Sequence, residues 1–235
     1  VNLPGTKAII LETTGCSSED LESALEILSE DELQRFHAFH FDQDRKDYAL
    51  AHALLRKTLS DLEPGTAPLD WQFAPMATGK PAVAGRSDLD FSLTHTRGLV
   101  ACAVTREGVI GIDAETDQRT VEVDMLMRDV CSPGERQELA KVEGAHKTSR
   151  FLDFWTLKEA YLKAVGLGIT ADLTTVSFTL ADDRDIAISA PPDLRRPASS
   201  FQISRRSGHW RVALAVFGGI DARDVEITLC EKRSF

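Results

Sequence analysis

Two carboxylates lie close together in the stretch VIGIDAE, residues 109–115, whose apolar pattern predicts a β-strand. Because side chains alternate along a strand, Asp113 and Glu115 share one face and the two isoleucines take the other. Acids spaced in this way can reach one hard cation, and Mg²⁺ typically takes one or two protein carboxylates besides water and phosphate oxygens. Solvated acids at a strand end would give the same pattern, so the residues alone leave both interpretations open.

A third acid lies in the stretch FWTLKEAYLKAVGLGI, residues 154–169, whose spacing predicts a helix. At about 100° per residue, Glu159 and Lys163 lie nearly opposite the stripe that contains Phe154 and Tyr161. Glu followed four residues later by Lys is a common surface ion pair worth about 0.2–0.5 kcal/mol. Apolar residues nevertheless lie one turn on either side of Glu159, so a chemical role stays open beside the ion pair.

Basic side chains gather in the first part of the chain. Arg45, His52 and Arg56 fall at i, i+7 and i+11 of the predicted helix DQDRKDYALAHALLRKTL, along one edge. Arg45 suits a surface ion pair, whereas the planar guanidinium of Arg56 could donate two hydrogen bonds to one phosphate. His95 ends a predicted strand in FSLTHTRG, and Lys80 lies in the loop TGKPAV. A structural histidine and an ordinary turn are the alternatives there.

The elements that must position these residues form two series with the same order, which predicts an α+β fold. The first series has a strand at 8–12, a helix opening at Ser29, a helix across 42–59, and strands near 71–74, 91–94 and 99–105. The second has a strand at 109–115, a helix opening at Ser132, a helix across 154–163, and strands near 176–180, 201–204 and 210–217.

The two series also match in sequence. Both helix openings are S-x-x-E capping boxes, 103 residues apart, and the strand residues Ile9/Glu12 and Ile112/Glu115 have the same offset. ALLR at 53–56 matches AYLK at 160–163, and FSLT at 91 matches FQIS at 201. Chance similarity of common patterns is the alternative. If the repeat is real, halves 1–108 and 109–235 pack about a pseudo-twofold axis, with a cleft that draws residues from both.

Composition narrows the class of protein. The chain has 235 residues, 43% of them hydrophobic, which is enough for a buried core. A net charge of −10 without a basic run argues against a nucleic-acid partner, although nucleotide-sized anions remain possible. The four cysteines lack CxxC spacing, so we expect reduced thiols and no zinc site. With neither a signal peptide nor an apolar run of about 20 residues, we expect a cytoplasmic protein without a membrane partner. The stretch 181–200 reads as a surface loop that could contain a short strand.

Several of these segments occur in the order and spacing of a known family. RFHAFHFDQDRKDYALAHALLR, GKP, FSLTHTRG, GIDAE and FWTLKEAYLKAVGLG together resemble the Sfp-type 4′-phosphopantetheinyl transferases, from about Leu28 to Ile169. The strongest elements are G-I-D-x-E and, about forty residues later, W-x-x-K-E-x-x-x-K. THT departs from the pattern, since many members have serine before the histidine, but Thr94 keeps the hydroxyl.

The resemblance implies a fold of two similar α+β halves and a defined reaction. The 4′-phosphopantetheine arm of coenzyme A would pass to a serine of an apo acyl or peptidyl carrier protein, with Mg²⁺ present and adenosine 3′,5′-bisphosphate released. It implies that Asp113, Glu115 and Glu159 bind the metal and that Glu159 accepts the serine proton, directly or through water. Lys158 and Lys163 would lie near the phosphates and the arm.

The resemblance also implies a coenzyme A site in the first half. Arg56 and His95 would hold the 3′-phosphate with Thr94 beside them, Lys80 would lie by the adenine, and Arg45 would assist. A chain with two halves has less need of a partner copy, so we expect a monomer. A Mg²⁺-dependent nucleotide phosphohydrolase and a non-catalytic coenzyme A binding module are the other functions considered. Glu159 and Lys163 argue against the binding module, because it needs no base.

Overall fold

Both predicted series of elements are present in the structure, a computed structural model that describes residues 5–118, 121–167, 171–183, 185–206 and 209–230. Gly168 and Ile169, at the end of the predicted second-half helix, lie outside these ranges. The first series consists of β1 (Thr6–Glu12), α1 (Ser18–Glu26), α2 (Glu30–Ala38), α3 (Asp42–Leu62), β2 (Phe73–Pro75), β3 (Pro81–Val83), β4 (Asp90–Thr96) and β5 (Leu99–Thr105).

The second series repeats this order. It consists of β6 (Val109–Thr116), α4 (Val123–Val130), α5 (Pro133–Leu139), α6 (Gly144–Val165), β7 (Ser177–Leu180), β8 (Ile186–Ser189), β9 (Ser200–Arg206), β10 (Trp210–Phe217) and finally β11 (Ile227–Leu229). β8 is the short strand that the stretch 181–200 was expected to allow.

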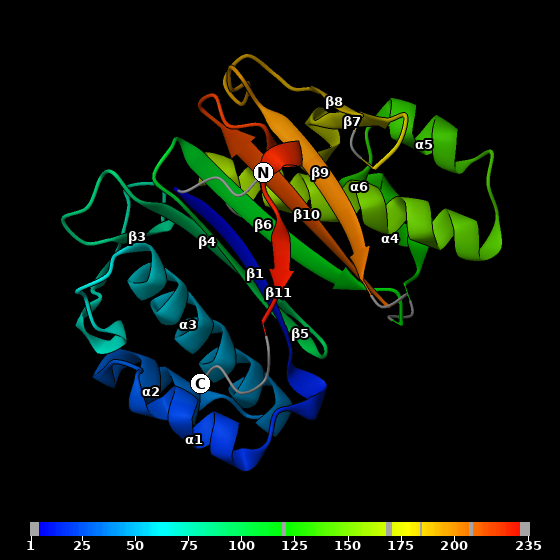
Figure 1. Cartoon of the computed structure of the whole chain (residues 1–235). Helices are drawn as coiled ribbons and strands as arrows, with labels where there is room; N and C mark the ends of the chain where they lie inside the picture. Colours follow the sequence, from blue (N-terminus) through cyan, green and yellow to red (C-terminus); the bar gives the residue numbers. More distant parts are fainter. Residues whose placement is uncertain (1–4, 119–120, 168–170, 184, 207–208, 231–235) are drawn as a thin grey trace.

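The sheets have matching topology. One has the order β11-β1-β5-β4 and the other β6-β10-β9, so in each half the last strand lies antiparallel between the other two. Each half also adds a two-stranded hairpin, β2–β3 or β7–β8. The predicted α+β fold with two similar halves is confirmed. β11 breaks the symmetry, because this C-terminal strand pairs in parallel with β1 of the first half (Figure 1).

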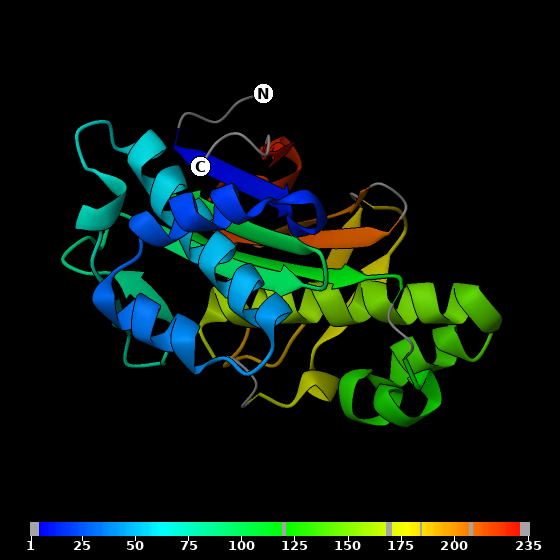
Figure 2. The ribbon, with the colours of Figure 1, turned by 90° about the horizontal axis from the view of Figure 1, so that it is seen from below.

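Three apolar clusters hold the layers together. One joins α3 to the first sheet, and a second joins α6 to the second sheet. The third lies between the sheets and takes side chains from β1, β5, β6, β10 and β11. Figure 2 shows α6 running along the strands. Because both sheets contribute to the third cluster, the halves stabilise one another. The boundary between residues 108 and 109 stays a prediction.

The two capping boxes are present, and in each the glutamate also accepts a hydrogen bond from a buried cationic side chain. Ser29 N donates to Glu32 Oε2 at 2.8 Å, and Ser132 N donates to Glu135 Oε2 at 2.7 Å. The long helix of each half then sends a cation to the same carboxylate, Arg56 Nε at 2.8 Å in the first half and Lys158 Nζ at 2.6 Å in the second. Lys158 is therefore the counterpart of Arg56, and the match of ALLR to AYLK, which aligned Arg56 with Lys163, was wrong.

The strand match at an offset of 103 was also wrong by one residue. Ile9 packs toward the helices of its own half, whereas Ile112 belongs to the cluster between the sheets. Because side chains alternate along a strand, an alignment that is off by one residue matches residues on opposite faces.

Some elements were not predicted. α1 and α4 were missed, and α6 begins ten residues before the predicted helix, at Gly144. The first turns of α6, GAHKTSRFLD, are mostly polar, so their periodicity is weak. α1 has a capping box formed by Ser17 and Asp20, where the pattern sought had glutamate.

Two expectations from composition can be compared with the structure. Among the described residues, Cys16, Cys102, Cys131 and Cys230 form no disulfide bond. Within the described ranges, no helix has the length and apolar character needed to cross a membrane.

Candidate active site

A close approach of α6 to β6 positions the candidate catalytic side chains. Gly111 on β6 lies under the helix, and a Cβ atom there would be 2.0 Å from the backbone oxygen of Ala160. Only glycine leaves room for this contact, which sets Glu159 and Lys163 of α6 over Asp113, the next β6 residue on the same face.

Asp113 is the centre of a small polar group. It is only 5% exposed, and its Oδ1 accepts hydrogen bonds from Thr94 Oγ1 at 2.9 Å and from Lys163 Nζ at 2.6 Å. Lys163 also donates to Ile112 O at 3.3 Å. Asp113 Oδ2 is buried and has no hydrogen-bond partner among the described residues. A buried carboxylate oxygen in this state is costly unless another group, such as a cation, binds it.

Glu159 lies in the same electrostatic environment. Burial raises the pKa of Glu159, the charge of Asp113 raises it further, and Lys163 opposes both effects. Of the two alternatives for this helix face, the surface ion pair does not describe the structure, because Lys163 is directed at Asp113 and Glu159 is half-buried. Two carboxylates and one ammonium instead form a compact charged group.

Glu115 is the third predicted metal ligand and lies on the same face of β6 as Asp113. It is 8% exposed and is the cross-strand partner of Arg211 on β10. In the part of the chain that the structure describes, no three Asp, Glu, His or Cys side chains lie together as a metal-binding group. The three predicted ligands are therefore not grouped together in the described structure, and a role of Glu115 as a metal ligand stays a prediction. The unpartnered Oδ2 of Asp113 and the like charge of Glu159 do fit a divalent cation.

The charged group lies where the two halves meet. β4 and β6 are adjacent but belong to different sheets. Side chains of β4, rather than its backbone, accept hydrogen bonds from the backbone of β6. Ile110 N donates to Asp90 Oδ2 at 2.8 Å, and Ile112 N donates to Ser92 Oγ at 3.0 Å. Thr94 makes the third contact of this seam, to Asp113. The first half therefore contributes directly to the environment of the carboxylates.

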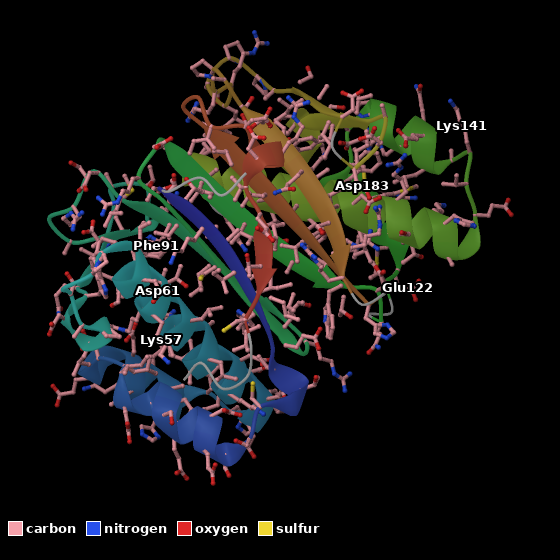
Figure 3. All side chains as sticks on the ribbon, in the orientation of Figure 1. Lys57, Asp61, Phe91, Glu122, Lys141 and Asp183 are labelled. Carbon is pink, nitrogen blue, oxygen red and sulfur yellow. The ribbon has the colours of Figure 1, made fainter. Side chains whose placement is uncertain are left out.

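A cleft of about 970 Å³ lies beside this seam, between α2, α3, β2 and β4. Its described lining comes from residues 29–95, all in the first half. A smaller cavity of about 340 Å³ takes its lining from both halves, including Lys80, Asp90, Val109 and Ala164, as expected for a cleft between them. His95 lines the cleft and is exposed. Several aromatic side chains also line it, including Trp71, Phe73 and Phe91, the last labelled in Figure 3.

Arg56 forms part of the cleft wall but is occupied by protein acceptors. It is 1% exposed, donates to Glu32 through Nε, and donates through Nη1 to Pro68 O at 2.8 Å and Trp71 O at 3.0 Å. Burial by itself would raise the pKa of Glu32, but bonds from His52 and Ser29 N and the charge of Arg56 lower it to about 2. These contacts support a structural role for Arg56 rather than the expected grip on a phosphate.

Of two further arginines of the first half, Arg35 lines the cleft and Arg45 does not. Arg45 donates to Phe39 O at 3.0 Å and lies over the ring of Phe36, and it is outside the described cleft lining. Arg35, which the sequence reasoning missed, does line the cleft and is exposed. The capping box predicted the helix of Arg35, but not the cleft that this helix borders.

The two other predicted lysines are directed away from the cleft. Lys80 donates to Asp90 Oδ2 at 2.7 Å and to Ile110 O at 3.2 Å, so its ammonium group joins the seam, while Gly79 and Pro81 line the cleft. Lys158 is fully buried against Glu135, Val130 O and Leu173 O. The expectation that Lys158 lies near the phosphates was wrong, since Lys158 belongs to the capping-box cluster of its own half.

The second half has aromatic packing where the first half has its cleft. Phe178 of β7 and Phe201 of β9 have ring centroids 5.0 Å apart, and Tyr161 of α6 contacts both. All three side chains belong to the core of that half. The two halves therefore differ at this place, with a cleft in the first half and packed aromatic side chains in the second.

Comparisons with known proteins agree on one family. Residues 109–230 match the family model described as the 4′-phosphopantetheinyl transferase superfamily. The chain is 33% identical over 178 residues to 4′-phosphopantetheinyl transferase HetI of Nostoc sp., covering 73% of each chain. It is 30% identical over 203 residues to a phosphopantetheinyl transferase of Thraustochytrium sp., covering 80% of this chain and 70% of the relative. A crystal structure of a holo-(acyl-carrier-protein) synthase from Bacillus anthracis is 25% identical with a TM-score of 0.41, covering 46% of this chain and 94% of that one.

Proposed function

The chain belongs to the 4′-phosphopantetheinyl transferase superfamily and is an enzyme of that kind, and from this premise we propose which of its residues carry out the transfer. The enzyme moves the phosphopantetheine arm of coenzyme A to a carrier protein. The serine oxygen of the carrier forms a new bond to the phosphorus that bears the arm, and the pyrophosphate bond breaks to release adenosine 3′,5′-bisphosphate. Such a reaction depends mainly on positioning and charge neutralisation.

Asp113 and Glu159 would hold a Mg²⁺ ion. The observation that carries this proposal is the buried Oδ2 of Asp113, which lacks a partner among the described residues while Oδ1 is held by two donors. The raised pKa of Glu159, caused by burial and then by the charge of Asp113, supports a cation between the two acids. Glu115, on the same strand face, remains a further candidate ligand. When bound, Mg²⁺ would neutralise the pyrophosphate charge that builds up during transfer.

Glu159 and Lys163 would serve the reacting groups. Glu159 would take the proton of the carrier serine, because burial and the charge of Asp113 raise its pKa and so make it a stronger base than an ordinary glutamate. Lys163 holds Asp113 in the structure, and its ammonium group would also lie within reach of the phosphates. These are roles in proton transfer and charge neutralisation, which the resemblance also implied.

The cleft of the first half would bind the nucleotide end of coenzyme A. Arg35 offers an exposed guanidinium and His95 an exposed imidazole for the 3′-phosphate, and Phe73 and Phe91 offer aromatic surfaces for the adenine. Arg56 would act indirectly, by holding the carbonyl groups of the loop that forms the cleft wall. Gly79 and Pro81 would contact the nucleotide in place of the Lys80 side chain.

The partner would be an apo acyl or peptidyl carrier protein, met by a cytoplasmic monomer. Four cysteines that form no disulfide bond in the described structure are consistent with a reducing compartment. Since the chain carries a net charge of −10, overall charge would not attract an acidic carrier, and a local surface must serve instead.

Intact-protein mass spectrometry of an apo carrier incubated with coenzyme A and Mg²⁺ tests these assignments. We expect the wild type to add one phosphopantetheine, and Glu159→Gln to load the carrier about 100-fold more slowly or worse. Cleavage of coenzyme A without carrier modification would support the phosphohydrolase, and binding without reaction would support the binding module. Wild-type loading by Glu159→Gln would remove Glu159 from the mechanism.

A further inference from the structure

Two consecutive residues of β4 face the two parts of the site. His95 points to the cleft beside α3, and the preceding residue, Thr94, points to the seam with β6. This follows from the alternation of side chains along a strand. Thr94 is 5% exposed, so its hydroxyl is not presented to solvent.

The hydroxyl of Thr94 determines which oxygen of Asp113 stays available. Thr94 Oγ1 donates to Oδ1 at 2.9 Å, and Lys163 Nζ donates to that same oxygen at 2.6 Å. Both donors lie on one side of the carboxylate, and Oδ2 is left buried and without a hydrogen-bond partner in the described part of the chain. A carboxylate held by one oxygen has its orientation fixed and its other oxygen available to a ligand.

We propose that Thr94 is a positioning residue for cation binding, which fixes Asp113 from across the seam so that Oδ2 receives the metal. The inference rests on the proposed function, because it takes Asp113 as a metal ligand. It differs from the expectation that Thr94 contacts coenzyme A, since the hydroxyl is directed to the carboxylate and away from the cleft. One strand of the first half thus serves both the nucleotide, through His95, and the metal ligand of the second half.

The neighbouring seam residue provides a matched control. Ser92 is on the same face of β4, is also 5% exposed, and also bridges to β6 by its hydroxyl, but its partner is the backbone N of Ile112 at 3.0 Å. Loss of the Ser92 hydroxyl weakens the seam without releasing the carboxylate of Asp113. A purely structural role for Thr94 predicts the same result at both positions.

Mn²⁺ titrations test the proposal, with binding followed by the electron paramagnetic resonance signal of the free ion in the presence of coenzyme A. The variants are Thr94→Val, which keeps the shape and removes the hydroxyl, Thr94→Ser, which restores the hydroxyl, and Ser92→Ala. We expect Thr94→Val to bind Mn²⁺ about 10- to 100-fold more weakly than the wild type, the usual effect of losing a group that orients a metal ligand. Thr94→Ser and Ser92→Ala should stay within about threefold of the wild type, well below that effect.

Each other result overturns the inference. Wild-type Mn²⁺ affinity in Thr94→Val, or an equal loss in Ser92→Ala, would show that the Thr94 hydroxyl does not position Asp113. A loss in Thr94→Ser as large as in Thr94→Val would show the same. Loss of metal-free coenzyme A affinity in Thr94→Val would return Thr94 to the nucleotide site. Failure of the wild type itself to bind Mn²⁺ would overturn the proposed metal site and the inference together. Binding by the wild type that is unchanged in Thr94→Val would overturn the inference alone.

Discussion

Replacement of Arg56 separates a structural role from a phosphate-binding role. Arg56→Met removes a buried guanidinium that donates to Glu32 and to two carbonyl oxygens of the cleft wall. Breaking a buried ion pair by removing one partner typically costs about 3–5 kcal/mol, because the other charge stays buried. His52 Nδ1 still lies 2.8 Å from Glu32 Oε1, so the carboxylate keeps one partner. We therefore expect the free energy of unfolding to fall by about 3 kcal/mol, the lower end of that range.

The pH dependence reports how strongly His52, Ser29 N and Arg56 together stabilise the Glu32 carboxylate. The pKa of Glu32 falls from 4.5 to about 2 in the folded chain, which corresponds to about 3 kcal/mol of stability at neutral pH. Because the folded pKa is the lower one, this stability is complete above pH 4.5 and is lost as the pH falls toward 2. Without Arg56 the folded pKa rises, so the difference between variant and wild type should be large at pH 7 and should narrow below pH 4.5.

Urea unfolding at pH 7 and at lower pH measures both effects. Arg45→Met is the matched control, since the Arg45 side chain on the same helix is 33% exposed and its loss should cost less than about 1 kcal/mol. If Arg56→Met unfolds within about 1 kcal/mol of the wild type and instead loses its preference for coenzyme A over dephospho-coenzyme A, the structural assignment is refuted.

Three further substitutions test the elements that position the site. Gly111→Ala should cost about 3 kcal/mol or more in urea unfolding, because the new Cβ would lie 2.0 Å from a backbone oxygen of α6, whereas Gly134→Ala has no atom within 4 Å and should be tolerated. Ser132→Ala should lower the unfolding free energy by about 0.5–2 kcal/mol through loss of the cap, and an unchanged value would remove the capping box from the account. Lys80→Met should lower the unfolding free energy, because the Asp90 carboxylate loses its buried cation. Its affinity for adenosine 3′,5′-bisphosphate, measured by calorimetric titration, should stay that of the wild type. A loss of this affinity at wild-type stability would contradict the placing of Lys80 in the seam.

The sequence predicted the parts of the fold that depend on local pattern. β5 and β10 were predicted with their observed bounds, because continuous apolar runs between turns mark buried strands. The capping boxes at Ser29 and Ser132 were correct for the same reason, since a cap is a contact between near neighbours. α4 is eight residues long and lacks a side-chain cap, so it gave no comparable signal.

The site was harder to predict, because the direction of a basic side chain depends on distant acceptors. Arg56, Lys80 and Lys158 all match family motifs, yet each is buried against a carboxylate that lies 10 to 24 residues away in sequence. The sequence shows the charge of each residue but not the acceptor that binds it. The shared face of Asp113 and Glu115 was predictable from strand alternation. The hydrogen bond from Thr94 to Asp113 was not, because it depends on how the two sheets lie against each other.

The central claim is that the Asp113 carboxylate at the seam between the halves is the centre of the transfer site. Its most direct test is the rate at which Asp113→Asn loads an apo carrier with phosphopantetheine, measured by intact-protein mass spectrometry at saturating coenzyme A and Mg²⁺. Asp124→Asn, which changes an exposed acid on α4, is the control. We expect wild-type loading by Asp124→Asn and a loss of about 100-fold or more in a folded Asp113→Asn. Loading by Asp113→Asn at the wild-type rate would contradict it.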